Sequence, residues 1–420
     1  MNGPRSAGRS SLLDDALERI APVLDEPHLE SVRDGLAALA PLLTVGSMAM
    51  LLQQLPLPAW QAHLAAQPDL AAGLRLPFDL TYGLLALYAV ASIAYHLAKR
   101  RGLEPLWPAG LAVLSLAISL WPIQADETAS LAAARLDYRG LFPAIVVALL
   151  SVEAYGWFMR RGLVLSVPSA VPPPIAHLLE ALAPTTVFAA IVWTIRVLAG
   201  LDLGHAVTSI ATALVPAASS FLSSVIAETT HAVLWVLGIH GDLTVGSVLQ
   251  PVWTSNLAAN AAAHVAGQRP PWIYTEMFRS YVAAGGSGGT LPLALYLLRS
   301  GSARLRVVGR HSVLACFFNI NEPLIFGAPI VFNPLLALPF VGITAINTIV
   351  AYLAHSLDWV SATVAFVPWI LPTPVLTFLA SSYDVRAGML GLVTWLIIPG
   401  IVWLPFFRRW EQQVIAAESA

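Results

Sequence analysis

The sequence predicts an all-α protein that crosses a membrane many times, with an N-terminal helical bundle and a C-terminal half of interrupted helices. Three observations predict this fold. Of the 420 residues, 57% are hydrophobic and 11% are charged, and the mean hydropathy is +0.72, whereas soluble domains carry about 25% charged residues. Apolar runs close to the roughly 20 residues that span a bilayer recur along the chain. In the second half, glycine, proline and polar residues interrupt these runs.

The first 34 residues are polar and charged, and aliphatic side chains recur at helical spacing from Leu12 to Leu24. This spacing predicts an amphipathic cytoplasmic segment on the membrane surface, and no cleavable signal is evident. Four apolar runs then follow, each long enough to cross the bilayer. They lie at residues 35–52, 78–97, 107–123 and 141–158.

Lysine and arginine indicate the orientation of these spans. Basic clusters occur before residue 34, at 99–101 and at 160–161, whereas the intervening loops are nearly balanced in charge. Cytoplasmic loops carry the excess of basic residues, so the N-terminus is predicted to be cytoplasmic. Further clusters at 299–310 and 408–409 are expected on the same side. This requires an even number of crossings between clusters, which gives about ten spans and a cytoplasmic C-terminus.

The proline-rich stretch at 166–184 predicts a joint between the two halves. The later interruptions are "GIHGD", "GGSGG", "NINEP" and "PWILPTP", at 238–242, 285–289, 319–323 and 368–374. Irregular backbone at membrane depth is tolerated only where it is buried in protein or lines a wet cavity, so the C-terminal half is expected to hold the transport site. The predicted divisions are 1–34, 35–200, 201–410 and a cytoplasmic tail at 411–420.

Glu322 is the leading candidate for a functional residue. It lies in "FFNINEPLIFGAPIVFNP" at 317–334, where Pro323 disfavours a continuous helix. A carboxylate in an apolar segment is costly and indicates a substrate, proton or partner role, or else a cap on free backbone N–H groups. Asn319 and Asn321 alternate with apolar residues, so an extended backbone would turn both amides to one face. There they could bind a ligand or only the hairpin backbone.

His240 lies between Gly238 and Gly241, which allow backbone to approach a ligand closely. It is either a ligand contact or a structural donor. The "GGSGG" segment reads as a flexible linker in a soluble protein, but its apolar flanks favour a hinge or a tight turn. Trp235 and Trp369 fit either an interfacial belt or stacking on the apolar face of a sugar ring.

Several classes of protein are excluded or disfavoured. The single cysteine, Cys316, lies in an apolar setting and is expected to be inert. No cysteine or histidine spacing indicates a metal site, so no metal or cofactor is predicted. No P-loop is present, which excludes ATP-driven transport by this chain itself. The partners expected are the lipid bilayer and a small solute, and not nucleic acid.

The motif series resembles one family, the IIC membrane subunits of sugar phosphotransferase systems in the lactose/cellobiose/diacetylchitobiose branch. The similar segments follow the family order over nearly the whole chain. They are "HLESVRDGLAALAPLLTVGS", "SVPSAVPPPI", "WVLGIHGD", "AAGGSGGTLPL" and "FFNINEPLIFGAPIVFNPLLALPF". The resemblance implies an N-terminal scaffold that forms a homodimer, and a C-terminal transport domain with re-entrant hairpins, in the bacterial cytoplasmic membrane.

The resemblance also implies the site and its chemistry. His240 and Glu322 would hold the sugar and act at its C6 hydroxyl, with Trp235, Asn319, Asn321 and Trp369 completing the site. The substrate would be a β-linked disaccharide, and the phosphoryl donor a phosphocysteine on a separate IIB protein supplied by IIA. Where the family usually has hydroxyl residues after the last tryptophan, this chain has Ile370 and Leu371.

Two other functions remain open at this point. Nothing in the chain resembles a IIA or IIB domain, which allows an orphan facilitator that moves sugar without phosphorylating it. A membrane sugar sensor that signals through a partner is the second alternative. A proton-coupled antiporter fits less well, because the asparagines suit hydroxyl recognition better than proton relay.

Overall fold

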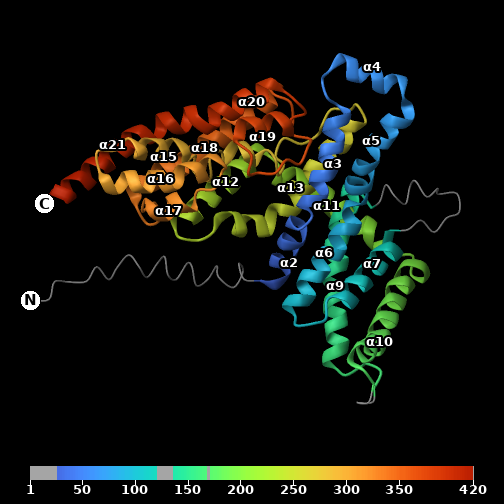
Figure 1. Cartoon of the computed structure of the whole chain (residues 1–420). Coiled ribbons are helices and arrows are strands. Elements are labelled where there is room, and N and C mark those ends of the chain that lie inside the picture. Colours follow the sequence, from blue (N-terminus) through green and yellow to red (C-terminus); the bar gives the residue numbers. More distant parts are fainter. Residues whose placement is uncertain (1–25, 121–135, 168–170, 420) are drawn as a thin grey trace, which may run out of the picture.

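The structure is a computed structural model that describes residues 26–120, 136–167 and 171–419 (Figure 1). The expected amphipathic segment before residue 26 lies outside the described residues. Within these ranges the chain forms helices joined by loops and turns, with no β-strand. The predicted all-α class is therefore confirmed.

The N-terminal half is a bundle of long apolar helices. Each of the four predicted apolar runs lies mainly within helix, and short 3₁₀ turns join α5 to α6 and open α9. The helices are α2 (Pro27–Ala37), α3 (Ala40–Gln53), α4 (Pro58–Ala66), α5 (Pro68–Thr81), α6 (Leu85–Arg100), α7 (Leu106–Leu120), α9 (Leu141–Arg160) and α10 (Pro173–Trp193).

Glycine allows close packing at the start of this bundle. At Gly35 in α2, a Cβ atom would come within 2.7 Å of the Ile93 backbone in α6. At Gly46 in α3, a Cβ would overlap the Thr81 hydroxyl at the end of α5. Small residues at such crossings let helix backbones approach closely, which is a common way of joining helices in membranes.

The C-terminal half consists of shorter, interrupted helices. The turns at 285–289, 318–321 and 366–372 separate its elements. The helices are α11 (Leu203–Ala218), α12 (Phe221–Val236), α13 (Gly241–Val265), α14 (Arg279–Val282), α15 (Leu291–Leu298), α16 (Ala303–Phe317), α17 (Glu322–Gly327), α18 (Pro334–Ser356), α19 (Thr373–Ala380), α20 (Val385–Leu392) and α21 (Ile398–Ser419).

The predicted joint at 166–184 is only partly a linker. The helix α10 begins at Pro173, and Pro184 lies inside it. Proline is tolerated in the first turn of a helix, where its missing N–H has no intrahelical partner, so the proline cluster opens α10. The helix continues through a π-turn at 194–198 and packs on α7 and α9. The boundaries at 34 and 410 likewise fall inside α2 and α21.

Six helical stretches of the described chain are long and apolar enough to cross a membrane, or seven if α11 and α12, bent by 75°, count as one broken span. The six are 27–53, 68–100, 138–160, 175–198, 334–356 and 385–418. The apolar helix α7, described over 15 residues up to the end of the described range at 120, is not counted among them. A multi-pass membrane protein is therefore confirmed, while the count of about ten spans remains a prediction.

The two halves meet along α2, α3 and α13 (Figure 1). The segment before α19 is bound to the bundle, because the Phe366 N–H donates to the Ser47 hydroxyl over 2.7 Å. Farther along, the Tyr383 hydroxyl donates to the Leu51 carbonyl over 2.8 Å. The N-terminal bundle thus holds one wall of the C-terminal half in place.

Candidate functional site

Asn319 joins three segments of the C-terminal half. It follows α16 with a φ of +62°, a left-handed conformation that Asn adopts more readily than most residues. Its Oδ1 accepts from the Gly285 N–H over 2.8 Å and from the Thr373 hydroxyl over 3.0 Å. Its Nδ2 donates to the carbonyls of Trp369 and Leu371, each over 2.7 Å. An amide offers two donors and two acceptor positions, so this side chain is fully engaged within the protein.

The backbone from Asn319 to Asn321 is not extended, so the reasoning from alternation was wrong. Asn321 has φ −122° and ψ 6° and caps α17. Its Nδ2 donates to the Ser287 carbonyl over 2.6 Å, so both amides reach the glycine segment through a turn instead. The hydrogen bonds of both amides go to protein groups, and their contact with a ligand stays a prediction.

The glycine segment at 285–289 is a buried, tightly packed turn. All four glycines have positive φ, between 58° and 88°. A Cβ at Gly286 would overlap the Asn321 side chain, and a Cβ at Gly288 would overlap the Phe340 ring. Only glycine fits these positions without strain. The segment is therefore a rigid support for the "NINEP" turn, and the flexible-linker reading is wrong.

Glu322 opens α17 directly after this turn. Its side chain is half-buried, and its Oε2 atom is inaccessible to solvent without a hydrogen-bond partner among the described residues. A buried carboxylate oxygen without a donor is costly, because it has lost its water without gaining a replacement. Glu322 thus presents an unused acceptor of the kind that a ligand hydroxyl satisfies.

His240 caps the N-terminus of α13 and contacts Trp235. Its Nδ1 accepts from the Leu243 N–H over 3.3 Å, so in the neutral ring the proton lies on Nε2. The His240 ring is 4.4 Å from the Trp235 ring between centroids, and the side of His240 away from it is exposed. The buried Trp235 Nε1 has no hydrogen-bond partner among the described residues. The loop thus presents an exposed donor beside an aromatic ring.

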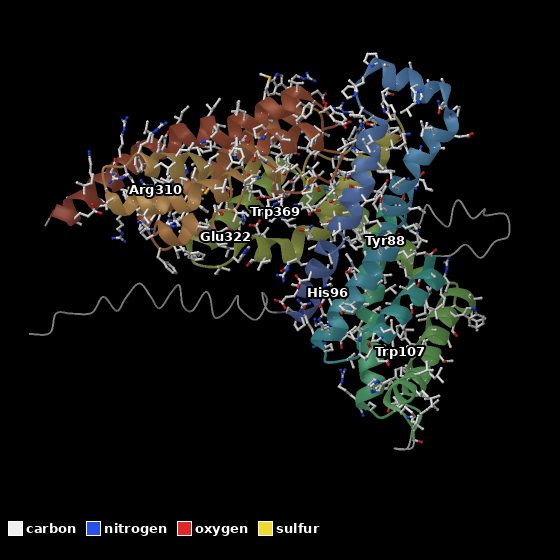
Figure 2. All side chains as sticks on the ribbon, in the orientation of Figure 1. Tyr88, His96, Trp107, Arg310, Glu322 and Trp369 are labelled. Atoms are coloured by element: carbon white, nitrogen blue, oxygen red, sulfur yellow. The ribbon has the colours of Figure 1, made fainter. Side chains whose placement is uncertain are left out.

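Direct contacts connect the segments that carry the six predicted residues. The Phe332 N–H, shortly after α17, donates to the Val236 carbonyl over 2.9 Å. Gly238, with φ +80°, packs against the same segment. The Trp369 carbonyl accepts from Asn319 in the "NINEP" turn, and Trp369 as a whole is 57% exposed. Figure 2 places Glu322 and Trp369 in the same half of the molecule.

A buried cluster of charged residues lies next to the start of α13, where His240 is located. Arg279 of α14 donates to Glu228 over 2.8 Å and to Asp242 over 2.7 Å, and its guanidinium lies 4.2 Å from the centre of the Trp253 ring. His231 lies 3.1 Å from Asp242. Glu228 and His231 are fully buried. We call Glu228, His231, Asp242 and Arg279 the ionic cluster.

The ionic cluster contacts both parts of the candidate site. Asp242 lies two residues after His240 at the start of α13. On the other side, the Ser287 hydroxyl is 3.3 Å from His231 Nε2, and the Ser287 carbonyl accepts from Asn321. The cluster therefore fixes the positions of the His240 loop and of the turn before Glu322 relative to each other.

Sequence reasoning missed this cluster. It gave no weight to Glu228, Asp242 or Arg279. The available signal was the pair Glu228 and His231, three residues apart in an otherwise apolar stretch and thus neighbours on one helix face. Nothing in the sequence indicates that Arg279, some 50 residues later, completes the cluster.

The arrangement suits recognition of hydroxyl groups. Glu322 supplies an acceptor, His240 a donor and the exposed Trp369 an aromatic face, whereas Trp235 is buried beside His240. Among the residues that the structure describes, no group of three or more histidine, cysteine or acidic side chains is placed to hold a metal ion.

The family model of the phosphotransferase system EIIC proteins matches residues 33–343. The chain belongs to the EIIC family. This span includes the end of α2, the ionic cluster, the glycine segment and the "NINEP" turn. The resemblance inferred from the motifs is therefore confirmed, and the chain is a membrane permease component of a phosphotransferase system.

EIIC relatives match along nearly the whole chain. The cellobiose-specific EIIC component of Geobacillus stearothermophilus is 30% identical, with 97% of this chain and 96% of the relative covered. The lichenan permease IIC component of Bacillus subtilis is 29% identical, with 96% and 94% covered. The solved structure of ChbC, the IIC component of an N,N′-diacetylchitobiose-specific system, superimposes with a TM-score of 0.91 at 30% identity, covering 97% of this chain and 99% of that one.

Proposed function

We propose that this EIIC protein binds a β-linked disaccharide, carries it across the bacterial cytoplasmic membrane and presents its C6 hydroxyl to a phosphorylated IIB protein. The observation that carries the proposal is the unpaired, buried Oε2 of Glu322 at the break between α16 and α17. The substrate class is supported by relatives named for cellobiose, lichenan and diacetylchitobiose.

Glu322 and His240 divide the recognition of the hydroxyl. The Glu322 carboxylate accepts a hydrogen bond from the C6 hydroxyl, and the Nε2–H of His240 donates a hydrogen bond to the oxygen of the same hydroxyl. Trp235 and Trp369 stack on the apolar faces of the sugar. Asn319 and Asn321 hold the turn that carries Glu322, and their direct contact with the sugar belongs to the proposal as well.

Phosphoryl transfer then uses Glu322 as the base. The C6 oxygen attacks the phosphorus of the phosphocysteine on IIB, the O–P bond forms and the S–P bond breaks, and the cysteine leaves as a thiolate. Glu322 takes the hydroxyl proton, which makes the oxygen a better nucleophile. A phosphate group carries about −1.5 to −2 charges at pH 7. A sugar phosphate cannot return through hydrocarbon at a useful rate, so uptake becomes one-way.

The proposal places both termini and the IIB-docking surface in the cytoplasm. The support is the distribution of basic residues. Relatives also support a IIB partner, because the chain aligns with lactose-specific proteins named EIICB, covering 71% of the one from Lactococcus lactis. We place IIB on a separate chain supplied by IIA, and we assign dimerisation to the N-terminal bundle.

The test compares Glu322→Gln with Glu104→Gln, a matched change of a carboxylate in the other half. Both variants are inserted in membranes and assayed for uptake of radiolabelled cellobiose with phosphorylated IIB. We expect Glu322→Gln to insert normally and to lose uptake, because an amide cannot take the hydroxyl proton. Glu104→Gln should transport normally. Normal uptake by Glu322→Gln would remove Glu322 from the assigned role.

A further inference from the structure

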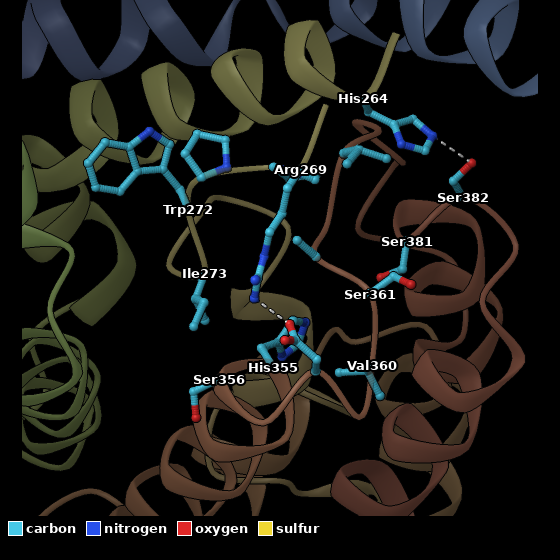
Figure 3. Close-up of a pocket in the computed structure, with 15 residues that line it drawn as sticks. His264, Arg269, Trp272, Ile273, His355, Ser356, Val360, Ser361, Ser381 and Ser382 are labelled. Carbon is cyan, nitrogen blue, oxygen red and sulfur yellow. Dashed lines mark hydrogen bonds and ion pairs between the residues drawn. The ribbon is translucent and has the colours of Figure 1, made fainter. Parts of the chain in front are cut away.

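One cavity of the C-terminal half contains none of the six predicted site residues. Its volume is about 700 Å³, within the range of about 300–1,000 Å³ that is typical of small-molecule sites. It lies between the ends of α13 and α18 and the turn after α19 (Figure 3). Its polar lining includes His264, His355, Ser361, Ser381 and Ser382.

His355 gives this cavity an unused acceptor. Its Nδ1 lies 2.7 Å from the Ala351 carbonyl, and a carbonyl only accepts, so Nδ1 carries a proton. In the neutral ring Nε2 is then an acceptor. His355 is 4% exposed, and its Nε2 has no hydrogen-bond partner among the described residues. Such an atom requires a donor, and the cavity beside it has room for one.

The charges at the cavity compensate each other. Arg269 and Asp358 both line it and pair over 2.6 Å. The remaining polar lining consists of imidazole rings, the Trp272 indole, hydroxyl groups and backbone. A lining without an uncompensated charge and with several hydroxyls favours a neutral ligand rich in O–H groups. A phosphate or carboxylate would find no free cation here.

The cavity lies at the end of the molecule opposite the N-terminal basic cluster. Near the start of α2, Glu30 and Asp34 pair with Arg100. At the far end of the same helical stretch, 27–53, Gln54 bonds to both His264 and Ser382 of the cavity wall. If the basic cluster is cytoplasmic, the cavity opens toward the outside.

We propose that this cavity is an external binding site for the incoming neutral sugar, separate from the site at Glu322. His355 Nε2 accepts from a sugar hydroxyl, and Ser361 and Ser381 on the adjoining wall exchange further hydrogen bonds with it. The proposal rests on the proposed function for the identity of the sugar, but not for the existence of the site.

The experiment uses the near absence of cysteine in this chain. The only native thiol, Cys316, is fully buried, so a thiol introduced by Ser361→Cys can be labelled selectively with a maleimide. The purified full chain is labelled with and without saturating cellobiose, once with Glu322 intact and once in a Glu322→Ala background. Sucrose, a neutral disaccharide that lacks the glycosidic linkage of cellobiose, serves as the comparison sugar. The unsubstituted chain controls for labelling of Cys316.

We expect cellobiose to slow the labelling of Ser361→Cys at least about threefold in both backgrounds. His355→Phe should abolish that protection, although it keeps an aromatic ring against Phe278 and Tyr281. Unchanged labelling would overturn the proposal, as would protection that needs Glu322 or that persists in His355→Phe. Ser356→Cys, which also lines the cavity, is a second reporter should the first variant not fold. Failure of the proposed function is seen separately, as absent uptake by the unsubstituted chain.

Discussion

Replacing Asn319 by alanine tests whether this residue is the structural centre of the site. The change removes four hydrogen bonds, to Gly285, Thr373 and the carbonyls of Trp369 and Leu371. At about 1 kcal/mol net for each, the loss of stability is about 4 kcal/mol. Alanine must also hold a φ of +62°, which costs about 1–2 kcal/mol more.

Asn319→Gly separates these two contributions. It removes the same hydrogen bonds but accepts positive φ without strain, at a cost in unfolded-chain entropy of about 0.4–1 kcal/mol. The glycine variant should therefore be more stable than the alanine variant by roughly 0.5–1 kcal/mol. Both should bind cellobiose more weakly than the unsubstituted chain, because the segment that carries Trp369 loses its attachment.

The assay is unfolding of the purified protein by SDS titration in mixed micelles, combined with equilibrium binding of cellobiose. An alanine variant as stable as the unsubstituted chain would refute the structural role. If sugar affinity falls while stability stays unchanged, Asn319 acts mainly as a direct sugar ligand. A glycine variant that is less stable than the alanine variant would contradict the argument from φ.

Two further predictions concern the supports of the site. Arg279→Met leaves the buried Glu228 without its arginine partner and should destabilise the protein by about 3–5 kcal/mol, whereas adding Glu228→Gln should recover part of this loss; additive losses would contradict a coupled cluster. Gly288→Ala should prevent stable insertion or lower the unfolding temperature strongly, since its Cβ would overlap the Phe340 ring. Gly342→Ala, with nothing within 4 Å of the added atom, should be neutral, and equal behaviour of the two alanine variants would exclude the packing argument.

Hydropathy predicted the helices of the N-terminal half because a bilayer dictates both their length and their composition. It did not predict α10 within the proline-rich stretch, where proline at the first helical turn looks the same as proline in a linker. The prediction of about ten spans came from the placement of the basic clusters, and six helical stretches of the described chain, or seven with the bent pair, pass the test of length and composition.

The candidate site was predicted in part. The cost of a carboxylate in an apolar run singled out Glu322, and flanking glycines singled out His240. The alternation around Asn319 and Asn321 predicted extended backbone, which was wrong, because Asn319 adopts a left-handed conformation and the chain turns there. The partnership of Arg279 with Glu228 depends on tertiary contacts between distant segments, which one sequence does not reveal.

The central claim is group translocation, and it is tested most directly by the chemical form of the sugar that accumulates. Vesicles containing the purified protein are given radiolabelled cellobiose, with phosphorylated IIB inside or absent, and the internal species are separated. The account predicts sugar phosphate inside the vesicles only when phosphorylated IIB is present. Free cellobiose that equilibrates whether or not IIB is present would contradict it and identify a facilitator, and binding without movement would indicate a sensor.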